Sequence, residues 1–179
     1  MKVELQKKIT IGVDLLTKIN DTDLADLCNI TEEAIKAGGG FGWLKNPGRN
    51  ILQKYWKGVG IIQNRKLIVG RMEKVIAGTL QLIFQPLNNE AQSKIFTISS
   101  HFVAPWARGY GLAKAMIDKA EEEAIENGAS YIQLDVRETQ EAAIHLFKSK
   151  GYSQWGTNPY YAQVGDKNIK GFYFTKKIK

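Results

Sequence analysis

Residues 101–124 read HFVAPWARGYGLAKAMIDKAEEEA, and this stretch decides the fold. An extended apolar segment ends at Pro105, Gly109 and Gly111 flank a tyrosine, and a helical pattern follows at once. The N-terminus of a helix carries unpaired N–H groups and partial positive charge, and glycines let an anion approach the backbone. Arg108 adds a fixed positive charge. The turn therefore suits a pyrophosphate.

The glycine spacing does not match the dinucleotide-binding pattern G-x-G-x-x-G, because Lys114 stands where the third glycine belongs. A lone G-x-G is a weak signal. The alternative interpretation is a plain strand-to-helix turn in which the glycines serve tight packing. Both interpretations remain open on this segment alone.

Composition predicts one globular domain over residues 1–179. The chain is 44% hydrophobic and 24% charged, as in soluble proteins. Its one cysteine, Cys28, permits no internal disulfide, so we expect a reducing, cytoplasmic setting. The N-terminal MKVELQKKITIG alternates and carries charge, which is not typical of a signal peptide. No apolar run approaches the roughly 20 residues of a spanning helix, so we expect no membrane association.

The net charge of +7 is compatible with nucleic acid, an anionic membrane surface or a phosphorylated ligand. The positive residues are scattered, and no basic helix with interleaved aromatic residues is present. We therefore expect no nucleic-acid partner, and we assign part of the charge to one anionic ligand. No metal ligands are assigned.

Periodicity predicts a mixed α/β fold in the order βααβββαβαββ, with antiparallel strands early and a β–α–β unit in the middle. Asn20 or Asp21 can cap the first helix, which ends at glycines 38–40. The expected strands are 3–11, 65–72, 75–85, 93–103, 130–136, 160–164 and 171–178, and the later helices are 51–59, 109–126 and 139–150.

The region from residue 98 to 152 resembles the GNAT superfamily of acyl-CoA-dependent N-acyltransferases. The motifs that carry the resemblance are V-x-P, R-x-x-G-x-A and a final amide-to-glycine helix, and the element order also agrees. A narrower resemblance, through GFGWLKNP, QKYWKGV, AGTLQL, YIQLDV and NPYYAQ, is to the tabtoxin-resistance and streptothricin-type acetyltransferases. The matching residues are Val103 and Pro105, then Arg108, Gly111 and Ala113, then Gln140, Ala143, Leu146, Phe147, Gly151 and Tyr152.

The resemblance implies that strands 93–103 and 130–136 splay apart around the pantetheine arm of acetyl-CoA, which acts as co-substrate. It implies a direct attack by a neutral amine on the thioester, with a strand N–H stabilising the oxyanion. The small-molecule amine is the expected acceptor. The expected cofactor-binding residues are Phe102, Val103, Arg108, Gly109, Tyr110, Gly111, Leu112, Ala113, Gln140, Ala143 and Phe147.

Three residues are candidates for the proton acceptor, namely Asp135, His101 and Glu138. Asp135 ends the second splayed strand, where a carboxylate can take the amine's proton. Its alternative roles are to cap the next loop or to pair with Arg137. His101 is the second candidate, because a histidine titrating near neutrality is a natural base. Strand alternation places it on the face of Ser99 and Val103, and a satisfied core histidine is its alternative.

Three positions depart from the family pattern, and one of them, Gln140, replaces an asparagine with an amide that is one methylene longer. Phe147 stands where relatives carry a tyrosine that protonates the departing thiolate, and phenylalanine has no proton to give. Another hydroxyl (Tyr152, Tyr160 or Tyr161) can act, or water, or the thiolate leaves unprotonated. Thr97 stands where many relatives carry a glutamate, and it cannot serve as a base.

The family builds its acceptor pocket from the first helices, their loop and the C-terminal hairpin. These segments supply aromatic residues, which suit a cationic amine. The competing hypothesis is a catalytically inactive acyl-CoA-binding sensor or partner module, and a homodimer is an open expectation because relatives often form dimers. The aromatic residues are Phe41, Trp43, Tyr55, Trp56, Tyr160 and Tyr161.

Overall fold

The computed structural model describes residues 9–39 and 42–179, and it confirms the predicted element order. Seven strands form one sheet in the order β1-β2-β3-β4-β5-β7-β6. The elements are β1 (Ile11–Leu15), α1 (Asp21–Lys36), α2 (Arg49–Val59), β2 (Arg65–Met72), β3 (Val75–Ile83), β4 (Ile95–Val103), α3 (Leu112–Glu126), β5 (Tyr131–Arg137), α4 (Glu141–Ser149), β6 (Ser153–Val164) and β7 (Lys167–Lys177), with short 3-10 turns η1 (Glu90–Gln92) and η2 (Pro105–Ala107).

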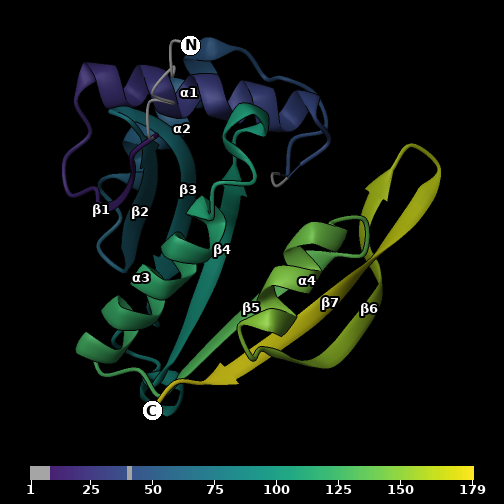
Figure 1. Ribbon diagram of the computed structural model, residues 1–179. Coiled ribbons are helices and arrows are strands. Elements are labelled where there is room, and N and C mark those ends of the chain that lie inside the picture. The colour runs from purple at the N-terminus through teal and green to yellow at the C-terminus, as the bar shows by residue number, and fades with distance from the viewer. Residues whose placement is uncertain (1–8, 40–41) are drawn as a thin grey trace, which may run out of the picture.

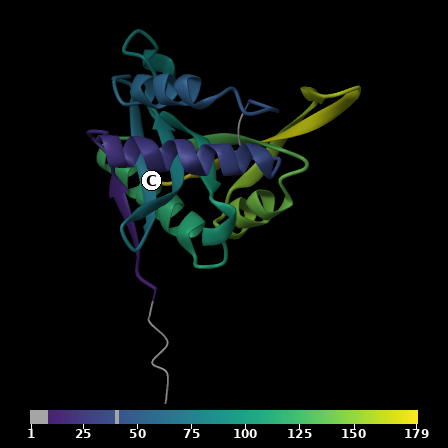
Figure 2. The ribbon, with the colours of Figure 1, turned by 90° about the horizontal axis from the view of Figure 1, so that it is seen from above.

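Helices cover the sheet on both sides. Helix α3 packs on the first four strands, and α2 lies on the opposite side of the molecule, against α1 (Figures 1 and 2). The predicted cap is present, since the Asn20 side chain accepts the Asp23 N–H at 2.8 Å. The two N-terminal helices are joined by the buried indole N–H of Trp56, which donates to the Thr31 hydroxyl at 3.0 Å. The sequence therefore builds one core around the sheet.

The central strands are parallel neighbours over a short length only. Strand β4 pairs with β5 from Ile95 with Tyr131 to Thr97 with Gln133, and no further pairs follow. The Gln133 amide donates to the Thr97 hydroxyl at 3.2 Å, so Thr97 lies at the closed end of this junction. Beyond it the two strands diverge (Figure 1), as the resemblance implied. The divergence opens a wedge in the middle of the sheet.

Four predicted boundaries were wrong, and one of them is the start of β7, which lies at Lys167 rather than 171. The first strand covers Ile11–Leu15 rather than 3–11, with residues 1–8 outside the described part of the chain. Helix α3 begins at Leu112 rather than 109, because Gly111 takes the left-handed conformation and serves as the N-cap. Strand β6 begins at Ser153 rather than 160.

No helix in the described part of the chain is both long enough and apolar enough to cross a bilayer.

Candidate active site

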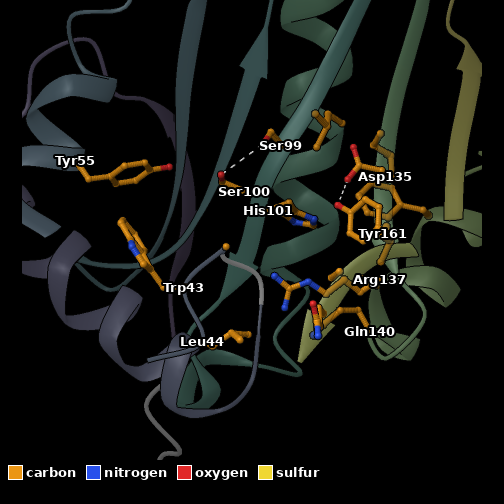
Figure 3. A pocket seen from close by; sticks show the side chains of 18 residues that line it. Trp43, Leu44, Tyr55, Ser99, Ser100, His101, Asp135, Arg137, Gln140 and Tyr161 are labelled. Carbon is orange, nitrogen blue, oxygen red and sulfur yellow. Dashed lines mark hydrogen bonds between the residues drawn. The ribbon is translucent and has the colours of Figure 1, made fainter. Parts of the chain in front are cut away.

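A cavity of about 820 Å³ lies in the wedge between β4 and β5 (Figure 3). Its floor comes from the diverging strands, one wall from α4, and the other sides from the α1–α2 loop, α2 and β6. The lining residues are Gly42, Trp43, Leu44, Tyr55, Ile98, Ser99, Ser100, His101, Leu134, Asp135, Val136, Arg137, Gln140, Ala143, Phe147, Tyr161, Ala162 and Gln163.

A bulge in β4 turns consecutive residues toward this cavity. Gln81 of β3 faces Ser99 while Thr79 faces Phe102, so β4 carries one extra residue between these pairs. Ser100 holds the bulge with φ of 49°, a left-handed conformation that is uncommon for a residue with a side chain. The predicted alternation of Ser99, His101 and Val103 on one face is therefore wrong, because the bulge shifts the phase of the strand.

His101 lies in the cavity wall, with its ring edge-on to Phe147 at 5.6 Å between centroids. Burial lowers the pKa of His101 to about 4, and a hydrogen bond to the backbone of Ala113 opposes the shift only in part. The imidazole is consequently neutral at neutral pH. The expectation of a histidine that titrates near neutrality was wrong. The Nε2 atom is buried and has no protein partner among the described residues, which leaves one polar atom of the wall for a ligand.

Asp135 accepts a hydrogen bond from the hydroxyl of Tyr161, and both side chains line the cavity (Figure 3). Asp135 belongs to β5, where it pairs with Tyr173 of β7, so it does not cap the following loop. A carboxylate at the mouth of an aromatic-walled cavity can accept a proton from an ammonium group or hold its charge. The structure therefore places the Asp135 carboxylate in the cavity wall beside the Tyr161 hydroxyl.

The α4 wall contains three of the predicted cofactor-binding residues. Gln140, Ala143 and Phe147 all face the cavity. The Gln140 amide donates to the Gly38 carbonyl at 3.2 Å, which ties the start of α4 to the end of α1. Phe147 confirms that no hydroxyl reaches the cavity from this position of α4.

The turn before α3 combines two glycines of positive φ with a run of backbone amides that have no acceptor among the described residues. Gly109 and Gly111 have φ of 87° and 81°, and a Cβ at either position would meet nothing within 4 Å. The first N–H of the helix with a backbone acceptor is that of Ala115, which donates to Gly111 at 3.0 Å. Within residues 9–39 and 42–179, no acceptor is paired with the amides of residues 109–114. These N–H groups lie at the positive end of a helix.

The remaining predicted cofactor-binding residues surround this turn rather than the cavity. Arg108 is exposed, and its Nε donates to the Val103 carbonyl at 3.3 Å, which holds the turn against the end of β4. Phe102, Val103 and Leu112 are buried in the core. Tyr110 is 47% exposed, whereas Ala113 is half-buried and contacts His101 through its backbone.

Tyr152 does not reach the cavity. The side chain is 3% exposed. Burial raises the pKa of its hydroxyl, and the nearby Glu121 carboxylate raises this pKa further. The Lys176 ammonium lies 5.4 Å from the Tyr152 ring centroid and donates to the Glu121 carboxylate at 2.8 Å. The prediction that Tyr152 supplies a proton is therefore wrong, because its hydroxyl is buried beside Glu121 of α3 and does not line the cavity.

Three of the predicted aromatic residues line the cavity, namely Trp43, Tyr55 and Tyr161. Trp43 and Tyr55 pack edge-to-face at 5.2 Å. Trp56 is fully buried in the core, and Tyr160 is 76% exposed and outside the cavity wall. Phe41 lies outside the described residues.

Sequence reasoning missed several wall residues. Strand alternation from Asp135 predicts Arg137 on the same face, and this signal was available. Ser99 and Ser100 reach the wall through the bulge, for which the sequence offers no glycine as a marker. Gln163 lies on β6, a strand whose start was misplaced.

No three histidine, cysteine or acidic side chains in the described ranges come together as a metal site would require.

Comparison with known proteins matches residues 31–152 to the "Acetyltransferase (GNAT) family". A curated relative from Azospirillum brasilense, an "uncharacterized N-acetyltransferase in hisH-hisA intergenic region", is 48% identical over 130 residues, which are 73% of this chain and 77% of that protein. An N-acetyltransferase structure from Staphylococcus aureus Mu50 has a TM-score of 0.79 at 18% identity, covering 95% of this chain and 99% of that one. The Salmonella typhimurium yncA structure, a putative acetyltransferase with acetyl-CoA, has a TM-score of 0.76 at 13% identity, covering 94% of each chain.

Proposed function

Because the chain belongs to the GNAT family of acetyltransferases, which take the acetyl group from acetyl-CoA, we propose that it acetylates a primary amine of a small molecule. One observation carries this proposal. The β4–β5 wedge leads into a cavity that combines a carboxylate with aromatic walls, while the amide-rich turn of α3 stands beside the same wedge.

The residues present fit acetyl-CoA. The turn offers a cluster of unpaired amides with room for a diphosphate, and His101 offers one buried unpartnered atom in the cavity wall. We assign the diphosphate to the turn and the pantetheine arm to the open side of β4. The proposed binding residues are Phe102, Val103, Arg108, Gly109, Tyr110, Gly111, Leu112, Ala113, Gln140, Ala143 and Phe147.

The acceptor side is assigned to the far part of the cavity. Trp43 and Tyr55 present aromatic surface to a cationic amine, and the Asp135 carboxylate attracts the same charge. Asp135 then accepts the proton that the nitrogen must lose. A small molecule suits this volume, which lies within the range of sites for small ligands.

Two measurements test the proposal together. Calorimetry with acetyl-CoA measures binding, and thiol release with a panel of small primary amines measures transfer. Saturable binding and release with at least one amine are expected. Absence of acetyl-CoA binding would overturn the proposal.

Phe147 favours one alternative, an acyl-CoA-binding sensor, because it places a group without a proton where the leaving thiolate is expected. Binding of acetyl-CoA without thiol release for any amine, including peptides with free N-termini, would favour the sensor.

A further inference from the structure

Tyr161 reaches the cavity from an unexpected strand. It belongs to β6, which is separated from β5 by β7 in the sheet, yet its hydroxyl donates to Asp135 of β5. Two features make this reach possible. Strand β6 carries two extra residues between its pairs Asn158–Gly171 and Ala162–Ile169, and this irregularity redirects Tyr161.

Gly171 supplies the second feature. The Tyr161 ring lies directly over this residue of β7, and a Cβ at Gly171 would stand 2.2 Å from the ring carbons. No side chain fits there. The missing side chain of Gly171 therefore leaves the space in which the Tyr161 ring passes over β7 toward the cavity.

The other hydroxyl groups of the wall are placed differently. Tyr55 accepts the Gln81 amide at 2.9 Å, and the hydroxyls of Ser99 and Ser100 lie 3.5 Å from each other. Tyr161 is the wall hydroxyl for which the structure records a bond to a carboxylate. The Asp135 carboxyl group can therefore return a proton to the Tyr161 hydroxyl after that hydroxyl has given its own proton away.

On the basis of the proposed function, we propose that Tyr161 protonates the departing CoA thiolate and that Asp135 returns the proton, with Gly171 as the positioning residue. The neutral amine attacks the thioester carbon, so a C–N bond forms and the C–S bond breaks. The nitrogen gives one proton to Asp135, the thiolate takes one from Tyr161, and Asp135 reprotonates Tyr161 through their hydrogen bond. Both side chains end as they began, and the products are the N-acetyl amine and CoA thiol.

The surroundings keep Tyr161 in its donor form. Burial raises the pKa of the phenol, the Asp135 hydrogen bond and charge raise it further, and Arg137 lowers it in part. The hydroxyl therefore keeps its proton while Asp135 is charged, and once Asp135 has taken the proton of the amine, the negative charge that raises the phenol pKa is gone and transfer to the thiolate becomes easier. This relay supplies the proton that Phe147 cannot provide.

The test compares Tyr161→Phe and Gly171→Ala with Gly156→Ala. Gly156 is the matched control in the same hairpin, because its Cβ would lie 3.8 Å from Tyr173, an ordinary contact. With an amine that the wild type acetylates, loss of a general acid is expected to lower kcat about 100-fold in Tyr161→Phe and Gly171→Ala, with the KM for acetyl-CoA unchanged. Gly156→Ala should retain wild-type kcat. Thermal unfolding of each variant reports folding.

A second donor separates proton transfer from structure. In the selenoester analogue of acetyl-CoA the leaving selenolate is a weaker base than a thiolate, so it needs no proton to depart. With this donor, the kcat values of Tyr161→Phe and Gly171→Ala should lie within a few-fold of the wild-type kcat. An undiminished defect would overturn the relay, as would wild-type kcat for Tyr161→Phe with acetyl-CoA. If none of the tested amines leads to thiol release by the wild type, the proposed function is overturned, and the relay is overturned with it.

Discussion

The sharpest test of the anion site is a charge placed at the N-cap of α3. Gly111→Glu and Gly111→Gln add side chains of nearly equal size into open space, and both are strained to the same extent by the φ of 81°. The two variants differ only in one negative charge. At about 5 Å from a phosphate charge, the repulsion is about 1 kcal/mol at the dielectric constant of water and about 3 kcal/mol at an effective constant of 20.

Since 1.4 kcal/mol corresponds to tenfold, the Glu variant should bind acetyl-CoA about 5- to 150-fold more weakly than the Gln variant. Calorimetry at low and high salt measures the difference. The difference in acetyl-CoA affinity between the two variants should become smaller at high salt. The turn is exposed, and the Debye length falls from about 10 Å at 0.1 M to about 3 Å at 1 M. Equal affinities of two folded variants at low salt would refute the placement of the diphosphate on these amides.

Three further outcomes are expected. Asp135→Asn should lower kcat at least tenfold and change acetyl-CoA affinity little, because the carboxylate lies on the acceptor side; equal turnover in steady-state assays would remove it from the mechanism. The pKa of His101 is lowered from 6.5 to about 4, so the unfolded chain binds this proton first, and up to about 3 kcal/mol of stability should be lost as pH falls from 6.5 to 4. Denaturant unfolding of His101→Gln should show a correspondingly shallower pH dependence, and identical slopes would contradict the buried neutral imidazole. Gly78→Ala should destabilise the protein by about 1–3 kcal/mol, because its Cβ would lie 2.9 Å from the Phe102 carbonyl, whereas Gly12→Ala meets nothing within 4 Å and should be neutral by thermal denaturation.

Elements with strong local signals were predictable from the sequence. The Asn20 cap and the glycines after α1 bounded that helix, and the β2–β3 hairpin followed from two apolar runs around a two-residue turn. The turn at Gly109 and Gly111 was found because positive φ and anion binding both favour glycine. Local chemistry and structure agree in these segments.

The misjudged elements lacked such signals. Strand β6 is exposed on both faces over much of its length, so hydrophobic alternation does not reveal where it starts. Its extra residues, and the bulge at Ser100, arise from pairing with distant strands. These two irregularities aim Tyr161 and His101 at the cavity. Tertiary pairing thus set the part of the site that the sequence did not predict.

The roles of Asp135 and Tyr152 illustrate the same limit. Both lie where the pattern put them along the chain, but one side chain faces the cavity and the other lies beside Glu121. Position along a strand or after a helix does not reveal which neighbours a side chain meets. That information came only with the packing of α3 and β7.

Because β4 and β5 pair at one end only, each strand presents an edge in the interior of the molecule rather than at the rim of the sheet. Only three residue pairs join β4 to β5, so beyond Thr97 the strand β4 no longer pairs with β5. A bound pantetheine, itself a chain of amides, can take the place of the missing strand. Exchange of the backbone amide hydrogens beyond Thr97 should then slow when the coenzyme binds, because the bound arm continues the hydrogen bonding of the sheet.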